Sequence, residues 1–136
     1  MSTRGLNMLL GIAALTLGGL LYILLRQESY IAVALEDCLF VTELQLLFSV
    51  CNCDFLKYYF PDFLWGFSLY CGLFAIHMPS ANGSVICGAA VFLCGCLWEA
   101  GQYWGIIGGT SDLIDVVMYL TAGLAGILLN LKERVK

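Results

Sequence analysis

Four long runs of apolar residues, separated by polar or glycine-rich segments, dominate the chain. Each run is close to the roughly 20 apolar residues that a helix needs to cross a bilayer. The expected helices cover residues 6–26, 61–78, 85–104 and 112–131. The pattern therefore predicts an all-α fold: residues 1–136 form a single membrane domain, an integral membrane bundle of four transmembrane helices.

The segment at residues 29–58, between the first two runs, has a different pattern. At helical spacing Glu36 and Glu43 fall on one face, with apolar residues opposite. Acids in the middle of a membrane span are costly. We therefore expect an amphipathic external helix at the membrane surface or packed over the bundle. A further span or a re-entrant segment through residues 31–50 is the alternative that the sequence leaves open.

Local signals mark the limits of the second helix. Pro61 suits a first helical position because its missing N–H would be unpaired there, and Asp62 favours the positive end of the helix dipole. The composition of residues 79–84 predicts a turn. The first run is too long for the apolar part of a signal peptide and no small-residue cleavage site follows it, so we expect a retained helix.

Composition agrees with a membrane protein. Hydrophobic residues make up 61% of the chain and charged residues 12%, and the mean hydropathy is +0.90, far from soluble averages. The six Lys and Arg residues form no basic stripe, which argues against nucleic-acid binding.

The positions of the basic residues predict the orientation in the membrane. Arg4 precedes the first run, and three basic residues follow the last, which places both termini in the cytoplasm. The acid-rich segment 29–58 and the turn between the third and fourth runs are then external. Aromatic residues expected at the outer interface are Tyr59, Trp65, Trp98, Tyr103 and Trp104.

Polar residues gather at the facing ends of the last two predicted helices, as Glu99-x-x-Gln102 and Asp112-x-x-Asp115. A spacing of three places each pair on one helix face, and Tyr119 continues the second stripe. Charged groups in a bilayer are disfavoured by roughly 2.5 to 3.5 kcal/mol, so they usually have a role. The pattern predicts a polar intramembrane site facing outward.

Capping is the competing interpretation of these acids. It accounts for Asp112, and less well for Asp115. It does not account for Glu99, because the dipole at the C-terminal end of a helix disfavours an anion. Carboxylates this close share a proton, a metal ion or a cationic ligand group. Glu99, Asp112 and Asp115 are therefore the candidate metal ligands.

Small residues and cysteines predict packing more than chemistry. Ala122, Gly123 and Gly126 allow close helix contact. Cys51-x-Cys53 is not a zinc spacing. The single histidine, His77, is expected near the cytoplasmic side of the membrane, opposite the external segment that holds these cysteines. Cysteines expected to pack as small apolar residues are Cys71, Cys87, Cys94 and Cys96. A disulfide among Cys38, Cys51 and Cys53 stays open.

The two acidic motifs and the short glycine-containing turn between them resemble the VanZ-like membrane proteins. The helix segment Ala122-Gly123-Leu124-Ala125-Gly126 and the start Pro61-Asp62-Phe63-Leu64-Trp65-Gly66-Phe67-Ser68-Leu69 extend this resemblance over most of residues 60–128. It implies a small protein of the bacterial inner membrane that is linked with the cell envelope. Some relatives are associated with resistance to glycopeptide-type antibiotics such as teicoplanin, and no established reaction comes with the family.

Three functional hypotheses follow. The first is an outward-facing acidic site that engages a lipid-linked envelope component. The second is a membrane enzyme whose acids hold a divalent cation and activate water on a lipid head group. The third is a non-catalytic scaffold subunit whose acids pair with basic residues of a membrane protein partner. A proton-driven exporter is disfavoured, because the first helix contains no acid.

Overall fold

A computed structural model describes residues 2–26, 43, 45, 53–77 and 81–130, and the regular structure of this part of the chain is entirely helical. The all-α class is thereby confirmed for the described residues. The elements are α1 (Thr3–Leu25), the π-helical turn η1 (Phe55–Tyr59), α4 (Phe60–His77), α5 (Ala81–Tyr103) and α6 (Leu113–Leu129). Most of the predicted external helix at 29–58 lies outside the described residues.

Short polar side chains fix the helix limits. Ser2 caps α1, since its hydroxyl accepts the N–H of Gly5 at 3.2 Å. Residues 81–84 belong to α5, although their composition predicts a turn. The reason is tertiary: Ser84 is buried and exchanges a 2.8 Å hydrogen bond with the Tyr70 hydroxyl of α4.

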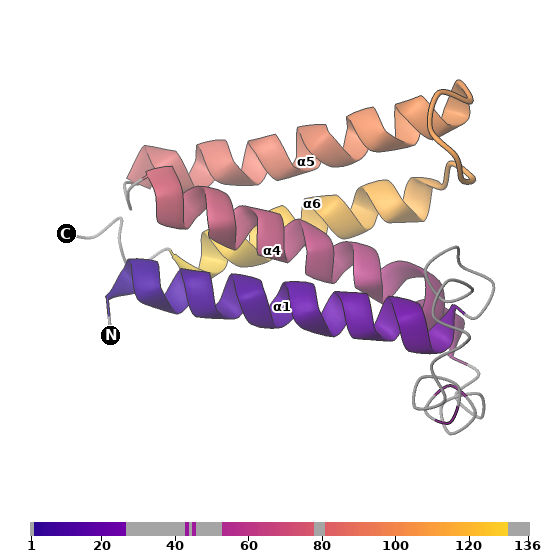
Figure 1. Ribbon diagram of the computed structural model, residues 1–136. Coiled ribbons are helices and arrows are strands. Elements are labelled where there is room, and N and C mark those ends of the chain that lie inside the picture. Colours follow the sequence, from indigo (N-terminus) through magenta and orange to yellow (C-terminus); the bar gives the residue numbers. More distant parts are fainter. Residues whose placement is uncertain (1, 27–42, 44, 46–52, 78–80, 131–136) are drawn as a thin grey trace.

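The four long helices run alternately up and down, and α4 is the central one (Figure 1). Helix α4 contacts α1, α5 and α6, and α5 also packs against α6. Among the described helices, the backbone of α1 lies close to α4 and η1 only. The starts of α4 and α6 and the ends of α1 and α5 therefore meet at one end of the bundle, opposite the start of α1 and the end of α6.

The core lies between α4 and α5. It is formed by Tyr70, Cys71, Phe74, Cys87 and Val91. The rings of Tyr70 and Phe74 stack with centroids 5.9 Å apart. The packing role expected of Cys71 and Cys87 is confirmed.

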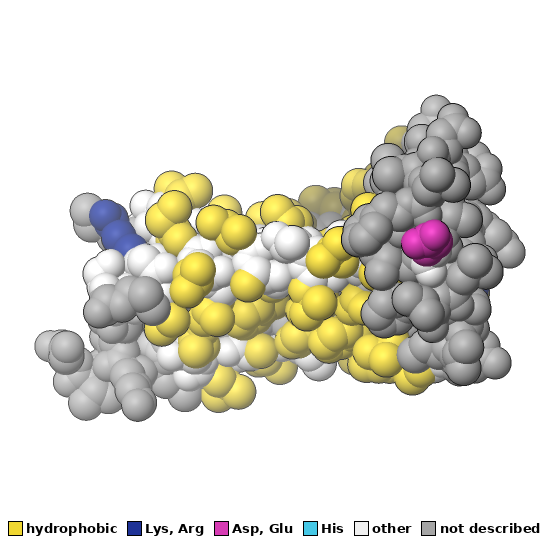
Figure 2. Space-filling model, turned by 60° about the horizontal axis from the view of Figure 1, so that its bottom comes forward, with side chains coloured by type: hydrophobic (Ala, Val, Ile, Leu, Met, Phe, Trp, Pro, Cys, Tyr) yellow, Lys and Arg dark blue, Asp and Glu magenta, His cyan; other side chains and the backbone are white. Residues whose placement is uncertain are grey.

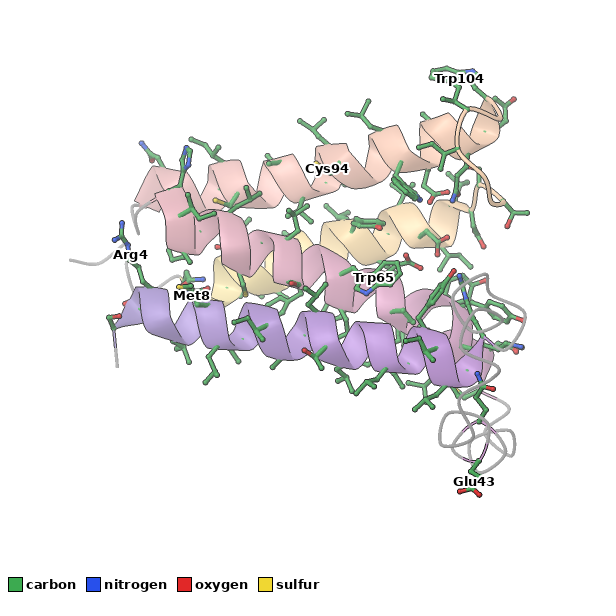
Figure 3. The ribbon with its side chains drawn as sticks, viewed as in Figure 1. Arg4, Met8, Glu43, Trp65, Cys94 and Trp104 are labelled. Atoms are coloured by element: carbon green, nitrogen blue, oxygen red, sulfur yellow. The ribbon has the colours of Figure 1, made fainter. Side chains whose placement is uncertain are left out.

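The other cysteines lie outside this core. Cys94 is exposed on α5 (Figure 3), which corrects the expectation that it packs, and Cys96 is partly buried. Cys53 is an exposed free thiol, so it forms no disulfide. Cys38 and Cys51 lie outside the described residues.

Small residues let the helices approach closely. A Cβ atom on Gly123 of α6 would lie 2.9 Å from the carbonyl oxygen of Gly88 in α5, and one on Gly126 would meet the ring of Tyr70. A Cβ atom on Gly11 of α1 would lie 3.1 Å from the Cβ of Cys71 in α4. Three helix pairs thus pack at distances that larger side chains would prevent.

The outside of the bundle is apolar. Figure 2 shows hydrophobic side chains along one flank of the molecule. Over the described residues, exposed large apolar side chains include Met8, Ile12 and Leu15 of α1 and Leu93 and Leu97 of α5. The helices Thr3–Leu25 and Asn82–Tyr103 are long and apolar enough to cross a membrane, and only 22% and 39% of their most apolar windows are buried. The core helix of a soluble protein would be mostly buried.

Candidate functional site

The starts of α4 and α6 and the end of α5 meet at one end of the bundle (Figure 1), and four acids belong to these segments. We call Asp62, Glu99, Asp112 and Asp115 the acidic cluster. Asp115 is within electrostatic reach of the other three. Asp62 was not among the predicted site residues, because its position in the first turn of a helix was sufficient explanation for it in the sequence.

Glu99 has a structural partner that the sequence did not reveal. Its side chain is 5% exposed, and Oε2 accepts the backbone N–H of Asp112 at 2.8 Å. The end of α5 disfavours an anion, but the start of α6 has unpaired N–H groups and a positive dipole end that favour one. The interpretation that capping leaves Glu99 unexplained is therefore corrected.

Asp112 uses both carboxylate oxygens. Oδ1 accepts the N–H of Ile114 at 2.9 Å, so Asp112 is the N-cap of α6. Oδ2 accepts the hydroxyl of Tyr59 at 3.3 Å, a long hydrogen bond that joins η1 to α6. Capping and this contact account for Asp112 without a ligand.

Gln102 braces the turn between α5 and α6. In the amide orientation that pairs both polar atoms, its nitrogen donates to the carbonyl of Thr110 and its oxygen accepts from the indole N–H of Trp98, each at 3.1 Å. The turn needs Gly105 and Gly109, whose φ angles are +69° and +131°. Gln102 therefore shapes the loop that presents Asp112 to Glu99.

Asp115 is the acid without a structural explanation. Its Oδ1 is the one buried side-chain oxygen or nitrogen of the described residues that has no hydrogen-bond partner. Such an atom usually costs about 1 to 3 kcal/mol. Asp62, at the start of α4, and Glu99 are the other acids that influence it most.

Tyr119 lies one turn further along α6. Its ring packs tightly against Gly95 of α5 and Gly66 of α4, where a side chain would collide with it. The phenol is within electrostatic reach of Asp62, Glu99 and Asp115. Tyr119 thus lies next to the acidic cluster, on the side toward the middle of the bundle. This is the position expected for the helical stripe through Asp112 and Asp115.

Arg26 is a site residue that sequence reasoning treated only as the border of the first helix. Its Nε donates to the carbonyl of Lys57 at 3.2 Å, and one terminal nitrogen donates to the carbonyl of Tyr58 at 3.1 Å. Its charge acts on both Asp62 and Asp115. The acidic cluster therefore has a cation beside it.

The described residues do not assemble a metal centre. They include no group of three or more His, Cys, Asp or Glu side chains that could hold a metal ion, so the metal-binding hypothesis for Glu99, Asp112 and Asp115 gains no support from the geometry. His77 is exposed at the far end of α4. The arrangement is suited to holding a cationic group or a shared proton.

An apolar groove of about 160 Å³ lies on another part of the molecule, between α1 and α4. It is lined by Met8, Gly11, Ile12, Leu15, Ser68 and Gly72. None of the acids borders it, so the groove and the acidic cluster are separate features.

None of the family models, curated proteins or solved structures compared with the chain matches it. The resemblance to VanZ-like proteins therefore rests on the motifs around Pro61, Glu99, Asp112 and Gly126.

Proposed function

We propose that this chain is a VanZ-like integral membrane protein of the bacterial cytoplasmic membrane, with four spans, both termini in the cytoplasm and the acidic cluster facing outward. We further propose that this cluster binds the cationic group of a lipid-linked envelope component and thereby contributes to resistance against glycopeptide-type antibiotics. The observation that carries the proposal is the buried, unpaired Oδ1 of Asp115 within reach of the charge of Asp62, where α4 and α6 begin.

The dimensions of the helices support four spans. Helix α4 has 18 residues and α6 has 17, which at 1.5 Å per residue gives lengths of about 27 and 26 Å, near the thickness of the hydrocarbon core. Apolar side chains exposed on α1, α5 and α6 would face lipid. A bundle this apolar outside would aggregate in water.

The acids of the cluster that take no part in hydrogen bonds of the fold support a binding site. Glu99 and Asp112 are held by hydrogen bonds within the fold. Asp62 and Asp115 have no such partner among the described residues, and the charge of Asp62 acts unfavourably on that of Asp115. A cationic ligand group would relieve that repulsion, which gives the site its expected selectivity.

Reporter fusions test the topology. A periplasmic reporter joined after residue 108 should be active, and one joined after Lys136 should be inactive, with the opposite pattern for a cytoplasmic reporter. Alkaline extraction should leave the protein in the membrane fraction. An active periplasmic reporter at the C-terminus would refute the cytoplasmic placement of that terminus, and active periplasmic reporters at both positions would refute a single span between them.

Antibiotic susceptibility tests the site. Cells that express the chain should tolerate more teicoplanin than cells that do not, and Asp62→Asn and Asp115→Asn should abolish this protection. Glu43→Gln is the matched control, since Glu43 is exposed and lies away from the bundle (Figure 3). Full protection by Asp115→Asn and Asp62→Asn, at native protein levels in the membrane, would refute the proposal.

A further inference from the structure

We propose that Arg26 is a positioning residue: it holds η1 against the end of α1 so that the hydroxyl of Tyr59 reaches Asp112 at the edge of the acidic cluster. The inference rests on the proposed function only in treating that cluster as the site. The contacts themselves come from three separate elements, α1, η1 and the N-cap of α6.

Arg26 makes two kinds of contact, hydrogen bonds to backbone carbonyl groups of η1 and cation–π contacts with two tyrosine rings. Its guanidinium donates to two successive carbonyl groups, those of Lys57 and Tyr58, at 3.2 and 3.1 Å. The same group lies 5.1 Å from the ring centroid of Tyr22 and 5.3 Å from that of Tyr58. A guanidinium at this distance from an aromatic ring is attracted by the negative face of the ring. Two directional bonds and two rings therefore fix its orientation.

Pro61 explains why a side chain is needed there. In a regular α-helix the carbonyl of Lys57 would accept the N–H of residue 61, but proline has none. The chain instead forms a π-helical turn, in which the N–H of Phe60 donates to the carbonyl of Phe55. Nε of Arg26 donates to the carbonyl of Lys57 from outside the helix. Short π-helical turns occur frequently at functional sites.

Tyr59 follows directly after the two carbonyl groups that Arg26 holds. Its hydroxyl donates to Oδ2 of Asp112 at 3.3 Å. Desolvation, followed by the charge of Asp112 and its hydrogen bond, and then Asp115 and Asp54, raise the pKa of the Tyr59 phenol above 10.0. The phenol is therefore protonated at neutral pH and acts as the donor to Asp112. Within the described residues, the acids of the cluster that have no side-chain hydrogen bond are then Asp62 and Asp115.

The sign of one titration distinguishes positioning from simple charge. Removing a nearby cation raises the pKa of a phenol, whereas releasing Tyr59 from Asp112 lowers it. We would place 3-fluorotyrosine at position 59 of the full chain in lipid nanodiscs and follow its titration by fluorine NMR. Arg26→Gln should lower the titration midpoint toward that of Asp112→Asn, and the double variant should lower it no further.

Two further variants complete the test. Arg26→Lys keeps the charge and loses the fork that holds two carbonyl groups, so it should also lower the midpoint, and it serves if Arg26→Gln does not fold. Arg4→Gln, at the opposite end of α1, should leave the midpoint unchanged. A midpoint that rises or stays constant in Arg26→Gln, or in Arg26→Lys when that variant is used, overturns the proposal. So do additive shifts with Asp112→Asn. The titration requires no ligand, so its failure is distinct from a failure of the antibiotic assay.

Discussion

Asn7 and Asn130, which stand 123 positions apart, exchange two hydrogen bonds between their side-chain amides, at 3.0 and 3.1 Å. Both side chains are buried. Each amide nitrogen donates a second bond within its own segment, to the carbonyl of Thr3 or of Gly126. The pair therefore joins the start of α1 directly to the C-cap of α6, although the backbones of these two described helices do not lie close together.

We predict that Asn7→Ala and Asn130→Ala each lower stability by about 1 to 3 kcal/mol, because each leaves the partner amide buried with unmade hydrogen bonds. The double variant should lose less than the sum of the two, since the second change removes the stranded group. Thermal unfolding in detergent measures this. Asn82→Ala, at an exposed position of α5, is the control and should change little. Strictly additive losses would contradict the pairing.

Gly123→Ala and Gly19→Ala should have opposite effects. A methyl group on Gly123 would press on the backbone of Gly88, which cannot move without separating α5 from α6. We expect a loss of about 1 to 3 kcal/mol. A methyl group on Gly19 meets nothing within 4 Å. The helix-forming preference of alanine should therefore raise the stability of the protein by roughly 0.5 to 1 kcal/mol. Equal effects of the two changes on thermal stability would refute the close α5–α6 contact.

Asp112 can be tested separately as a cap and as a charge. Asp112→Ala should destabilise by roughly 0.5 to 2 kcal/mol, because the N–H of Ile114 loses its acceptor. Asp112→Ser restores a capping oxygen without the charge and should recover most of that loss. Ser111→Ala is the control, as Ser111 is exposed next to the cap. If Asp112→Ser is as unstable as Asp112→Ala, the charge and not the cap holds the start of α6.

Asp115→Asn should stabilise the protein while it removes the proposed activity. The substitution removes one of several like charges from the cluster, and its amide nitrogen can donate to a neighbouring carboxylate in place of the unpaired oxygen. Glu99→Ala should have the reverse effect on stability, because it leaves the N–H of Asp112 without its acceptor. Such a trade-off between stability and function marks a functional residue. A lower unfolding temperature for Asp115→Asn would indicate a structural role instead.

The positions of the four long helices could be predicted from the chain alone to within a few residues, since apolar runs of this length and local caps act over a few neighbouring residues. Asp112 ends the turn and begins α6 through a hydrogen bond to a residue two positions away. The stripe from Asp112 through Tyr119 to Gly126 follows from helical periodicity alone, and burial increases along it.

The partners of Glu99, Arg26 and Asn7 could be found only from the three-dimensional arrangement. Each bonds to an atom 13 to 123 positions away, and the spacing of residues along one helix carries no information on which ends of different helices meet. The same holds for residues 81–84, where the contact between Ser84 and Tyr70 outweighs the turn preference of the local sequence. Helix position is a local property of the chain, whereas pairing depends on how α4 brings the other helices together.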